Sequence, residues 1–569
     1  MVFMSEEGEV QVYERHNDVI TRNTVKPFSY QDTIITFNGW RYDYPMWGAL
    51  LANKTNAELK QISDDIILNG TMPWVIEKRY GIEIPPMDHI DIINVLPLTA
   101  SLKIYGGRIN FPKLQDLPLD PSAIITAEDA PLMRKYCGND CQVTWALTHK
   151  VQPQIEVREK MGIQYGLDLR SKSDAQIAEA VIASEYVKIT GTPLYKPDSV
   201  KPSYKYDRPE FIDFKGPTLS KILGDISRAR FTIKPSNGQV EEPDELKQVI
   251  EIDDKKYKMG IGGLHSVDEP GSVTTNEEHF LVDIDVASYY PRIILNGGYY
   301  PDHMGTVFLE IYENIVTKRL AAKASGDDVT NAALKIVING TFGKFGSMYS
   351  KIYAPRLMFH TTVTGQLALL MLIEEFADTS IEVLSANTDG LTLRVKHSDQ
   401  HLLKILVADW EITTGFKMES TDYQSYHRRD VNNYMVITDD GKTKVKGTFA
   451  ETGLSKNPAN SIIYEAITAY FRNGDAVEFT IEQCNDLTKF ISLRTVKGGA
   501  YWGDEILGKS VRWYHSWLSA IPIQYRTNDK KVPLTDGTVP LMDLPEQIPY
   551  DLNRQWYIDE ANKLLEKMK

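Results

Sequence analysis

Apolar and acidic residues alternate along residues 281–291, which read LVDIDVASYYP. Asp283 and Asp285 lie between apolar positions, and this period of two is typical of a strand with two unlike faces. Two tyrosines and a proline follow, which predicts that the strand ends there. A strand end holds a carboxylate in a fixed place, so Asp285 is suited to bind a hard cation such as Mg²⁺. By itself, the pattern indicates no more than a strand that meets a turn.

A β-hairpin is predicted nearly a hundred residues later. Its strands are 381–386 and 391–395, and its turn is Asn387-Thr388-Asp389-Gly390. The plain interpretation of this segment is a turn and nothing more. If Asp389 instead faces Asp285 across a sheet, the two carboxylates can hold a pair of divalent cations about 4 Å apart.

The rest of the chain has less regular patterns. Residues 1–150 read as mixed α/β, and residues 165–280 are rich in Pro, Lys and Asp with several short strands. After Lys456, interleaved aromatic and basic residues predict mostly helix. The separate elements expected are a hairpin at 2–13, a buried strand at 33–37, a helix from about 129 to 148, a flexible link at 260–264, two helices within 307–345 around a turn at 325–328, and a buried helix at 363–376.

One predicted helix carries an unusual face. Lys335, Asn339, Phe342 and Gly343 are spaced i, i+4, i+7 and i+8, so they share one side of the helix. A cation, an amide, an aromatic ring and a glycine are the groups needed to grip a triphosphate and stack beneath a base. On the preceding helix, Arg319 and Lys323 are spaced i, i+4, although a solvated basic face explains that pair equally well.

Length and composition limit the class of protein. A chain of 569 residues is expected to form several domains, and 42% hydrophobic and 25% charged residues are ordinary values for a soluble protein. We find no signal-peptide pattern, expect no membrane-spanning segment, and see too few cysteines for a disulfide framework, which favours the cytoplasm. The net charge of −14 argues mildly against nucleic acid, yet residues 426–531 carry 15 Lys and Arg against 12 Asp and Glu.

Together these segments resemble family B DNA polymerases. Residues 285–291 (DVASYYP) resemble motif A, Lys335-x-x-x-Asn339-x-x-Phe342-Gly343 resembles motif B, and residues 387–390 (NTDG) resemble motif C, in the family's order. The resemblance implies an α/β multidomain fold, in which an RNase H-like exonuclease domain precedes a right-hand palm, fingers and thumb. The expected parts are 1–160 (exonuclease-like), 161–300 (linker and first part of the palm), 301–346 (fingers hairpin), 347–450 (second part of the palm, with motif C) and 451–569 (thumb).

The resemblance also implies roles for single residues. Asp285 and Asp389 are the expected catalytic residues and, with the backbone carbonyl of Val286, the ligands of two Mg²⁺ ions, which Mn²⁺ can replace. Tyr290 is expected to lie under the sugar and exclude a 2′-OH. The full nucleotide-binding set is Ser288, Tyr289, Tyr290, Arg319, Lys323, Lys335 and Asn339, and the expected primer and DNA contacts are Gly262, Gly263, Lys446, Lys509 and Arg512.

Several residues depart from the family pattern. Asn387 replaces the first aspartate of motif C, which makes it a candidate modulator of the metal site. Gly260 replaces a tyrosine before Gly262-Gly263, and Thr448 replaces the tyrosine that usually follows Lys446 by two residues. Asp283 should share a face with Asp285, and is expected to support the strand or, alternatively, to compensate for the missing carboxylate.

The N-terminal region resembles the family's 3′–5′ exonuclease only in part. Asn38 and Asp43 match its second motif, and Tyr136 and Asp140 match its third. The first motif, Asp-x-Glu, is absent, and its nearest substitute, Glu7-Gly8-Glu9, reads as a solvated hairpin tip. Two carboxylates without that pair should hold two metals poorly, so we expect weak or absent proofreading.

The sequence therefore predicts a template-directed DNA polymerase that adds dNTPs to a primer 3′-OH. The alternatives are a 3′–5′ exonuclease whose polymerase-like part only binds DNA and a catalytically inactive DNA-binding scaffold. Motif variants and compact length favour a bacteriophage enzyme acting in genome replication in the host cytoplasm. The expected partners are primer–template DNA, dNTPs, and single-stranded-DNA-binding and other replisome proteins, with the enzyme itself a monomer.

Overall fold

The computed structural model describes residues 2–569 except 7, 9, 13–31 and 85. The chain divides into two compact units, each formed from three segments of sequence. Unit 1 comprises Met1–Ser173, Glu451–Ile463 and Ile481–Ile558. Unit 2 comprises Asp174–Ala450, Tyr464–Thr480 and Asp559–Lys569. The boundaries fall inside three helices of the C-terminal region, α13 (Ser461–Asn473), α14 (Val477–Gln483) and α15 (Arg554–Met568), so the finer division into five parts stays a prediction.

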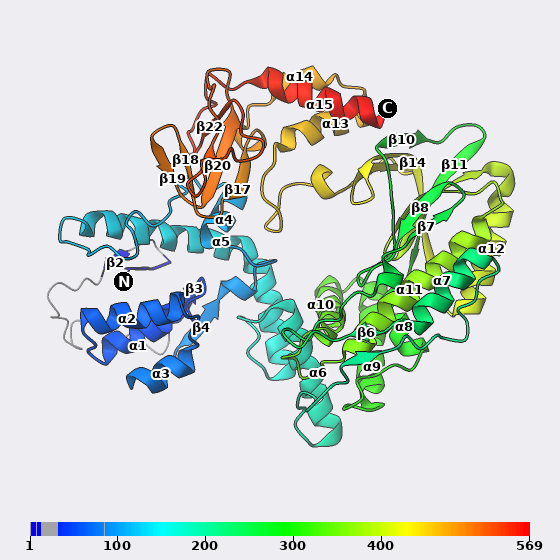
Figure 1. Cartoon of the computed structure of the whole chain (residues 1–569), viewed down its shortest axis with the longest axis horizontal. Helices are drawn as coiled ribbons and strands as arrows, with labels where there is room; N and C mark the ends of the chain where they lie inside the picture. The colour runs from blue at the N-terminus through cyan, green and yellow to red at the C-terminus, as the bar shows by residue number, and fades with distance from the viewer. Residues whose placement is uncertain (1, 7, 9, 13–31, 85) are drawn as a thin grey trace. The chain divides into compact units, whose positions relative to one another are not determined.

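The N-terminal part of unit 1 combines small sheets with helices (Figure 1, blue to cyan). Strands β1 (Val2–Met4) and β2 (Val10–Val12) form the predicted antiparallel hairpin. Strands β3 (Thr33–Thr36) and β4 (Asp88–Asp91) are parallel, so their carboxyl ends lie together. The predicted strand at 33–37 therefore exists, but it is only partly buried. The helices are α1 (Asp43–Leu51), α2 (Asn56–Ile67), α3 (Pro73–Tyr80), α4 (Leu102–Arg108) and α5 (Ala130–Tyr165).

The C-terminal part of unit 1 is made mainly of strands, so the prediction of helix after Lys456 is wrong for most of this region. Two sheets run in the orders β17-β20-β22 and β19-β18-β21. All six residues of β20 (Ser510–His515) are buried, and a strand buried on both faces lacks the alternation that signals a strand. The other strands are β17 (Ser492–Thr495), β18 (Ala500–Trp502), β19 (Glu505–Leu507), β21 (Gln524–Tyr525) and β22 (Thr538–Pro540).

A large antiparallel sheet forms the centre of unit 2. Its strand order is β16-β15-β14-β11-β13-β12-β9-β8-β7, and β10 also pairs with β14. The predicted acidic strand is β11, which lies in the interior of the sheet between β13 and β14. The strands are β7 (Val249–Ile252), β8 (Lys255–Lys258), β9 (His265–Ser266), β10 (Gly271–Thr274), β11 (His279–Val286), β12 (Glu382–Asn387), β13 (Gly390–Lys396), β14 (Met418–Asp430), β15 (Asn433–Thr438) and β16 (Thr443–Lys446).

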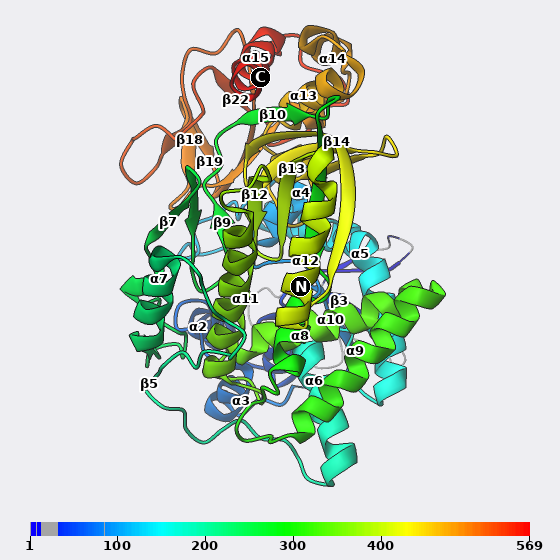
Figure 2. The ribbon, with the colours of Figure 1, turned by 90° about the vertical axis from the view of Figure 1, so that its right-hand side faces the viewer.

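Helices α7 (Pro217–Arg228), α11 (Pro355–Phe376) and α12 (Gln400–Thr414) cover one face of this sheet (Figures 1 and 2). Val282, Ile284 and Val286 of β11 belong to the apolar core beneath them. Because side chains alternate along a strand, Asp283 and Asp285 share the opposite face, as predicted. The helices thus cover the apolar side of β11, and its acidic side faces away from them.

Two helices form the predicted hairpin between 307 and 345. Helix α9 (Val307–Ser325) ends at Gly326, which has the left-handed conformation that favours glycine. Helix α10 (Asp328–Phe345) begins where the side chain of Asp327 accepts a hydrogen bond from the backbone N–H of Thr330 at 3.0 Å. Helix α6 (Asp174–Thr190) packs against α10 and was not predicted, because its many valines and isoleucines favour strand in isolation.

Helix α11 is the one candidate for a membrane span among the described residues. By length and composition alone its 22 residues could cross a bilayer, whereas the sequence analysis expected no such segment. However, 89% of its most apolar window is buried inside the protein. The helix is therefore the central core helix of unit 2. Unit 2 also contains α8 (Tyr289–Asn296), which follows β11 directly.

Candidate polymerase-like centre

Motifs A and C meet at one end of two neighbouring strands. Asp285 on β11 lies opposite Gly390 on β13, and the backbone N–H of Val286 donates a 2.8 Å hydrogen bond to the carbonyl oxygen of Asp389. A Cβ atom at Gly390 would overlap the Asp285 carboxylate, so this close approach requires glycine. The predicted juxtaposition of Asp285 and Asp389 is therefore present in the structure.

The turn that carries Asp389 is tightly bonded. Thr388 has a φ of 63°, and its N–H donates to the carbonyl of Leu264 at 2.8 Å. The N–H of Asp389 turns back to the carbonyl of Asn387 at 2.7 Å. Gly263 packs so closely on Thr388 that an added Cβ would lie 2.9 Å from its Oγ1. These backbone hydrogen bonds and the close packing on Gly263 help to hold Asp389 in place.

The two carboxylates lie in a region of strong negative potential. Both residues reach solvent, yet the surrounding protein displaces water from them. This desolvation, followed by the charges of Asp283 and Asp389, raises the pKa of Asp285 to about 7. Desolvation also raises the pKa of Asp389, while Lys446 opposes the shift at both residues. A cation bound between them would relieve this repulsion.

Asp283 is occupied by hydrogen bonds. Its two carboxylate oxygens accept from Thr392 Oγ1 at 2.7 Å and from the hydroxyl of Tyr423 at 2.8 Å. Both donors lie on the strands that flank β11. This supports the interpretation of Asp283 as polar support for the strand over a compensating metal ligand.

The hydrogen bonds of the Asn387 side-chain amide keep it from acting as a metal ligand. Its Nδ2 donates to the carbonyl oxygen of Val431 at 3.0 Å, and its Oδ1 accepts from Thr388 Oγ1 at 3.2 Å. The side chain thus joins the motif C turn to the loop between β14 and β15. A carboxylate at this position could not donate to that carbonyl.

The two tyrosines of motif A point in different directions. The Tyr290 ring lies 4.6 Å from that of Phe342 in motif B, and its hydroxyl donates to the carbonyl of Gly262 at 2.8 Å. Desolvation, followed by the charge of Asp389, raises the pKa of Tyr290 to about 12. Tyr289 is instead buried and donates to the carbonyl of Gly365 at 2.5 Å. The assignment of Tyr289 to nucleotide binding is therefore wrong, because its side chain is part of the core.

The predicted face of α10 is open. Lys335, Asn339 and Gly343 are exposed, and the residues between them pack inward. On α9, Lys323 lies 3.4 Å from Glu419, and Arg319 Nε is buried without a hydrogen-bond partner among the described residues. Buried polar groups of this kind usually have a hydrogen-bond partner, so the Arg319 guanidinium has a donor left unused within the described residues.

Ser288 borders a cavity of about 280 Å³. The backbone of Ser288 is left-handed, with a φ of 53°, where β11 gives way to α8. The lining includes two cations that the sequence analysis did not identify, Arg292 and Lys417, the second of which pairs with Glu411 at 2.8 Å. Arg292 directly follows the Tyr-Pro of motif A. Its place next to that motif is the one sequence signal that could have identified it as a site residue. The full lining is Ala287, Ser288, Arg292, Leu320, Gly415 and Lys417.

The expected DNA contacts divide into exposed and buried residues. Lys446 Nζ lies 5.6 Å from the centre of the Tyr434 ring. Burial lowers the pKa of Lys446, but the charges of Tyr434, Asp389 and Asp285 outweigh burial and raise the pKa above its ordinary value. Lys509 is exposed in unit 1. Arg512 is fully buried and donates to the carbonyl oxygens of Leu541, Phe111 and Pro112, and desolvation lowers its pKa to about 10. Its assignment to DNA is therefore wrong.

The second exonuclease-like motif of unit 1 lies at the ends of β3 and β4. The backbone N–H groups of Asn38 and Trp40 donate to the carboxylate of Asp91 at 2.7 and 3.2 Å. Asp91, at the end of β4, was not predicted because no family motif marks it. Desolvation and the charge of Asp91 raise the pKa of Asp43 to about 6.

Asp140 already has a cationic partner. Lys103 Nζ forms an ion pair with its carboxylate and lies 4.5 Å from the centre of the Tyr136 ring. The Lys103 side chain is largely buried, so this contact is part of the packing. Desolvation raises the pKa of Tyr136 to about 12. The substitute acidic pair, Glu7 and Glu9, lies outside the described residues.

The residues present fit a divalent cation in unit 2 better than in unit 1. Within the described part of the chain, no group of three or more His, Cys, Asp or Glu side chains is arranged for a metal. Asp285 and Asp389 nevertheless offer hard oxygen donors whose mutual repulsion a cation would relieve.

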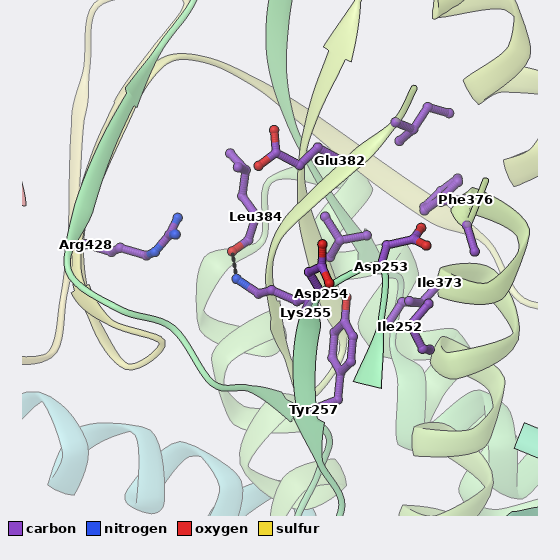
Figure 3. A pocket seen from close by; sticks show the side chains of 13 residues that line it. Ile252, Asp253, Asp254, Lys255, Tyr257, Ile373, Phe376, Glu382, Leu384 and Arg428 are labelled. Carbon is purple, nitrogen blue, oxygen red and sulfur yellow. Dashed lines mark hydrogen bonds between the residues drawn. The ribbon is translucent and has the colours of Figure 1, made fainter. Parts of the chain in front are cut away.

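The cavity in Figure 3, about 270 Å³ between the β7–β8 hairpin and the end of α11, is lined by none of the predicted site residues.

Sequence comparison finds known proteins that are similar to this chain. No protein-family model matches the chain. The DNA polymerase of Thermococcus sp. (strain 9oN-7) is 21% identical over 536 residues, which are 89% of this chain and 64% of that protein. DNA polymerase 1 of Sulfurisphaera ohwakuensis is 25% identical over 252 residues, 36% of this chain and 27% of that protein. A solved family B DNA polymerase from Pyrobaculum calidifontis aligns over all of this chain and 74% of its own at 14% identity, with a TM-score of 0.41.

The sequence matches confirm the predicted resemblance to DNA polymerases. The chain spans 64% of the length of the Thermococcus polymerase and a smaller share of the Sulfurisphaera enzyme.

Proposed function

We propose that this chain is a template-directed DNA polymerase of the family B type, which adds dNTPs to the 3′-OH of a primer. The observation that carries the proposal is the meeting of the three motifs in unit 2. Asp285 and Asp389 lie at one end of two paired strands, and Tyr290 of motif A packs on Phe342 of motif B. DNA polymerase relatives that match up to 89% of the chain support the same conclusion.

In this proposal Asp285, Asp389 and the backbone carbonyl of Val286 would hold two Mg²⁺ ions, which Mn²⁺ can replace. Bound there, the cations would stabilise the attacking and departing oxygens of an in-line displacement at the α-phosphate. The work of the chain is to hold both carboxylates rigidly, and the bonded Thr388–Asp389 turn supports that role. Asn387 acts only indirectly, by anchoring this turn to Val431.

The nucleotide would lie between α10 and the turn after β11. Lys335, Arg319 and Lys323 would bind the triphosphate, and the unsatisfied Nε of Arg319 supports this assignment. Arg292 is a further candidate, because it lines the cavity beside Ser288. Asn339 and Phe342 would face the base. Tyr290, fixed by Phe342 and by the carbonyl of Gly262, would exclude a 2′-OH and favour dNTPs over rNTPs.

We also propose that 3′–5′ proofreading is weak or absent. The Lys103 ammonium occupies the Asp140 carboxylate, where a metal would have to bind. A nuclease as the main activity is therefore less well supported than a polymerase.

The wider setting is proposed from the motif variants. The enzyme would replicate a bacteriophage genome in the host cytoplasm as a monomer on primer–template DNA, with single-stranded-DNA-binding and other replisome proteins as partners. This setting is inferred from the sequence and not from the fold.

A single assay separates the three candidate functions. Purified protein with Mg²⁺, a labelled primer–template and dNTPs should extend the primer, whereas a nuclease would shorten it and an inactive scaffold would leave it unchanged. Robust synthesis by Asp389→Ala protein would contradict the assignment of the active site. Incorporation of rNTPs by Tyr290→Ala but not by the wild type would support the role of Tyr290.

A further inference from the structure

A glutamine on α11 is buried in the apolar core of unit 2. Gln366 is only 1% exposed, and the residues that follow it on the helix, 367–370, are buried as well. Its Nε2 donates to the carbonyl oxygens of Gly260 at 2.7 Å and Thr362 at 3.0 Å. Its Oε1 accepts from the backbone N–H of Gly260 at 2.9 Å. A buried amide is costly unless its polar groups are bonded, and here both N–H donors and the carbonyl oxygen are.

The Gln366 amide binds both backbone polar groups of a single residue, Gly260. Because Nε2 meets two carbonyl oxygens, the orientation of the amide follows from its partners. Gly260 belongs to no strand and lies in the stretch between β8 and β9, which we call the linker segment (residues 260–264). The side chain thus bonds to this segment as a neighbouring strand would, and anchors its first residue to α11.

The linker segment is bonded to motif A and to the motif C turn through its backbone. The carbonyl oxygen of Gly262 accepts from the hydroxyl of Tyr290 at 2.8 Å. The carbonyl oxygen of Leu264 accepts from the N–H of Thr388 at 2.8 Å. A shift of the segment would therefore move the acceptor of the Tyr290 hydroxyl and disturb the turn that carries Asp389.

Helix α11 also holds Tyr290 through the residue before it. Tyr289 donates to the carbonyl oxygen of Gly365 at 2.5 Å, and Gly365 directly precedes Gln366. A Cβ at Gly365 would lie 3.2 Å from the Tyr289 ring, so the helix and the ring are closely packed there. Two adjacent residues of one helix thus fix the backbone before Tyr290 and, through the linker segment, the carbonyl that its hydroxyl meets.

We propose that Gln366 is a positioning residue for nucleotide selection, which places the Tyr290 ring by anchoring the linker segment at Gly260. The inference rests on the proposed function in one respect, the role of Tyr290 in excluding a 2′-OH. Gln366 is buried and acts only through the segment. A ring that loses its fixed place leaves room for the 2′-OH, so loss of the anchor should reduce discrimination against rNTPs more than it slows dNTP incorporation.

Amide hydrogen exchange of the full-length protein tests the anchor without any reaction. Gln366→Met keeps the length of the side chain and removes its three hydrogen bonds. We expect exchange to become about fivefold faster or more, the change that corresponds to one lost hydrogen bond, in peptides that cover the linker segment and the motif C turn at 387–390. Mass spectrometry of the digested protein measures both peptides.

Thr361→Val is the matched control for this measurement. Thr361 is also fully buried on α11, but its hydroxyl donates at 2.8 Å to the carbonyl of Leu357 within the same helix. The control should leave exchange in both peptides at the wild-type rate. Unchanged exchange in Gln366→Met, or equal acceleration in the control, would overturn the anchor.

Nucleotide selection is the second measurement, made as single-turnover incorporation of a dNTP and of the matching rNTP. Gln366→Met should lower the ratio of the two rates about fivefold or more, while dNTP incorporation slows less than about threefold. Tyr290→Phe, which removes only the hydroxyl, should also lower the ratio. Because both changes act through the Gly262 carbonyl, the double variant should lose much less than the product of the two single losses. A loss equal to that product would overturn the proposed route.

The outcomes separate this inference from the proposed function. Unchanged selection in Gln366→Met protein that extends a primer would overturn the inference and leave the polymerase proposal intact. Faster exchange in the variant, where the wild type itself extends no primer, would support the anchor and contradict the polymerase proposal.

Discussion

The polymerase-like and exonuclease-like regions each contain two aspartates at the positions of family motifs, but the surroundings of those aspartates differ. In unit 2, Asp285 and Asp389 reach solvent, and repulsion between their negative charges disfavours the charged form. Nothing in the described structure neutralises these two charges fully. In unit 1, Asp140 is paired with Lys103, and Asp43 is desolvated beside Asp91. Motif residues in the expected order are therefore insufficient evidence for a metal site.

The two regions differ in whether the protein itself supplies a positive charge beside the carboxylates. A carboxylate that already has an ammonium partner gains little from a divalent cation and must lose that partner first. Two unpaired carboxylates, in contrast, gain most of their stabilisation from the cation. The comparison therefore predicts one active centre and one inactive centre in the same chain, and each of the following experiments tests a part of it.

The largest expected effect is on catalysis in unit 2. Asp389→Ala and Asp285→Asn should each lower primer extension by on the order of 10³-fold or more, because the metal ligands supply several kcal/mol of transition-state stabilisation. DNA binding, measured by fluorescence anisotropy, should be largely retained. Single-turnover incorporation at saturating dNTP is the measurement. Near wild-type rates in either variant would place the active centre elsewhere.

Stability provides the control for Asp285→Asn. The pKa of Asp285 in the folded protein lies above its ordinary value, so its charged form destabilises the fold once the pH exceeds that ordinary value. Without divalent cations, the variant should therefore melt at a higher temperature than the wild type at pH 8. The difference should shrink as the pH falls through 7 and vanish below about pH 4.

Gly390→Ala should have the next largest effect. The added Cβ would overlap the Asp285 carboxylate and displace it from its position beside Asp389. We expect a loss of about 10- to 100-fold in the single-turnover rate, since small misplacements at a reacting centre carry large costs. Gly271→Ala is the matched control, because a Cβ there meets no atom within 4 Å and the residue lies in the same sheet. Equal rates in both variants would mean that the position of Asp285 is not critical.

The pH dependence of synthesis reports the charge on Asp285. Below its pKa of about 7 the carboxyl group is protonated, so at subsaturating Mg²⁺ the rate should rise roughly tenfold per pH unit until it levels off. Asp283→Asn removes the largest neighbouring charge and should shift the curve to lower pH. Lys446→Met removes a charge that lowers this pKa and should shift the curve to higher pH. Shifts in the same direction would contradict the electrostatic account.

Periodic segments explain how much could be predicted from sequence. Strand β11, the β12–β13 hairpin and the α9–α10 hairpin have strong local signals, and the structure contains all three near their predicted bounds. The residues that the prediction assigned wrongly depend on distant partners instead. Arg512 is surrounded by carbonyl groups of segments about 30 and 400 residues away, and Tyr289 contacts Gly365 of α11. No local pattern in the sequence contains such information.

Unit 1 shows the same limit more strongly. The ion pair of Lys103 with Asp140 joins α4 to α5 across 37 residues, and the carboxylate of Asp91 organises a turn more than 50 residues earlier in the chain. The motif pattern therefore located Asp43 and Asp140 but could not show that Asp140 is paired with Lys103.

Removal of Lys103 should affect stability more than activity. Lys103→Ala leaves the partly buried Asp140 without its cation and removes an apolar stem that packs on Tyr136, so we expect a loss of about 1–3 kcal/mol in the free energy of unfolding. Lys113→Ala, whose partner Asp543 is exposed and 4.0 Å away, should change it by less than about 0.5 kcal/mol. Urea denaturation measures both. Metal-dependent release of 3′ nucleotides by wild-type protein, abolished by Asp43→Ala, would overturn the contrast between the two centres.

The smallest effect is expected for Asn387→Asp, which restores the first aspartate of motif C. The Asn387 amide donates to the carbonyl of Val431, and an aspartate would place a charge against that carbonyl and lose the hydrogen bond. We therefore expect a change of less than about threefold in primer extension, with a cost of about 1 kcal/mol in stability. A large gain in activity would mean that the side chain turns toward Asp285 and binds a cation there. Asn387 would then be a lost ligand, and the anchor to Val431 a secondary contact.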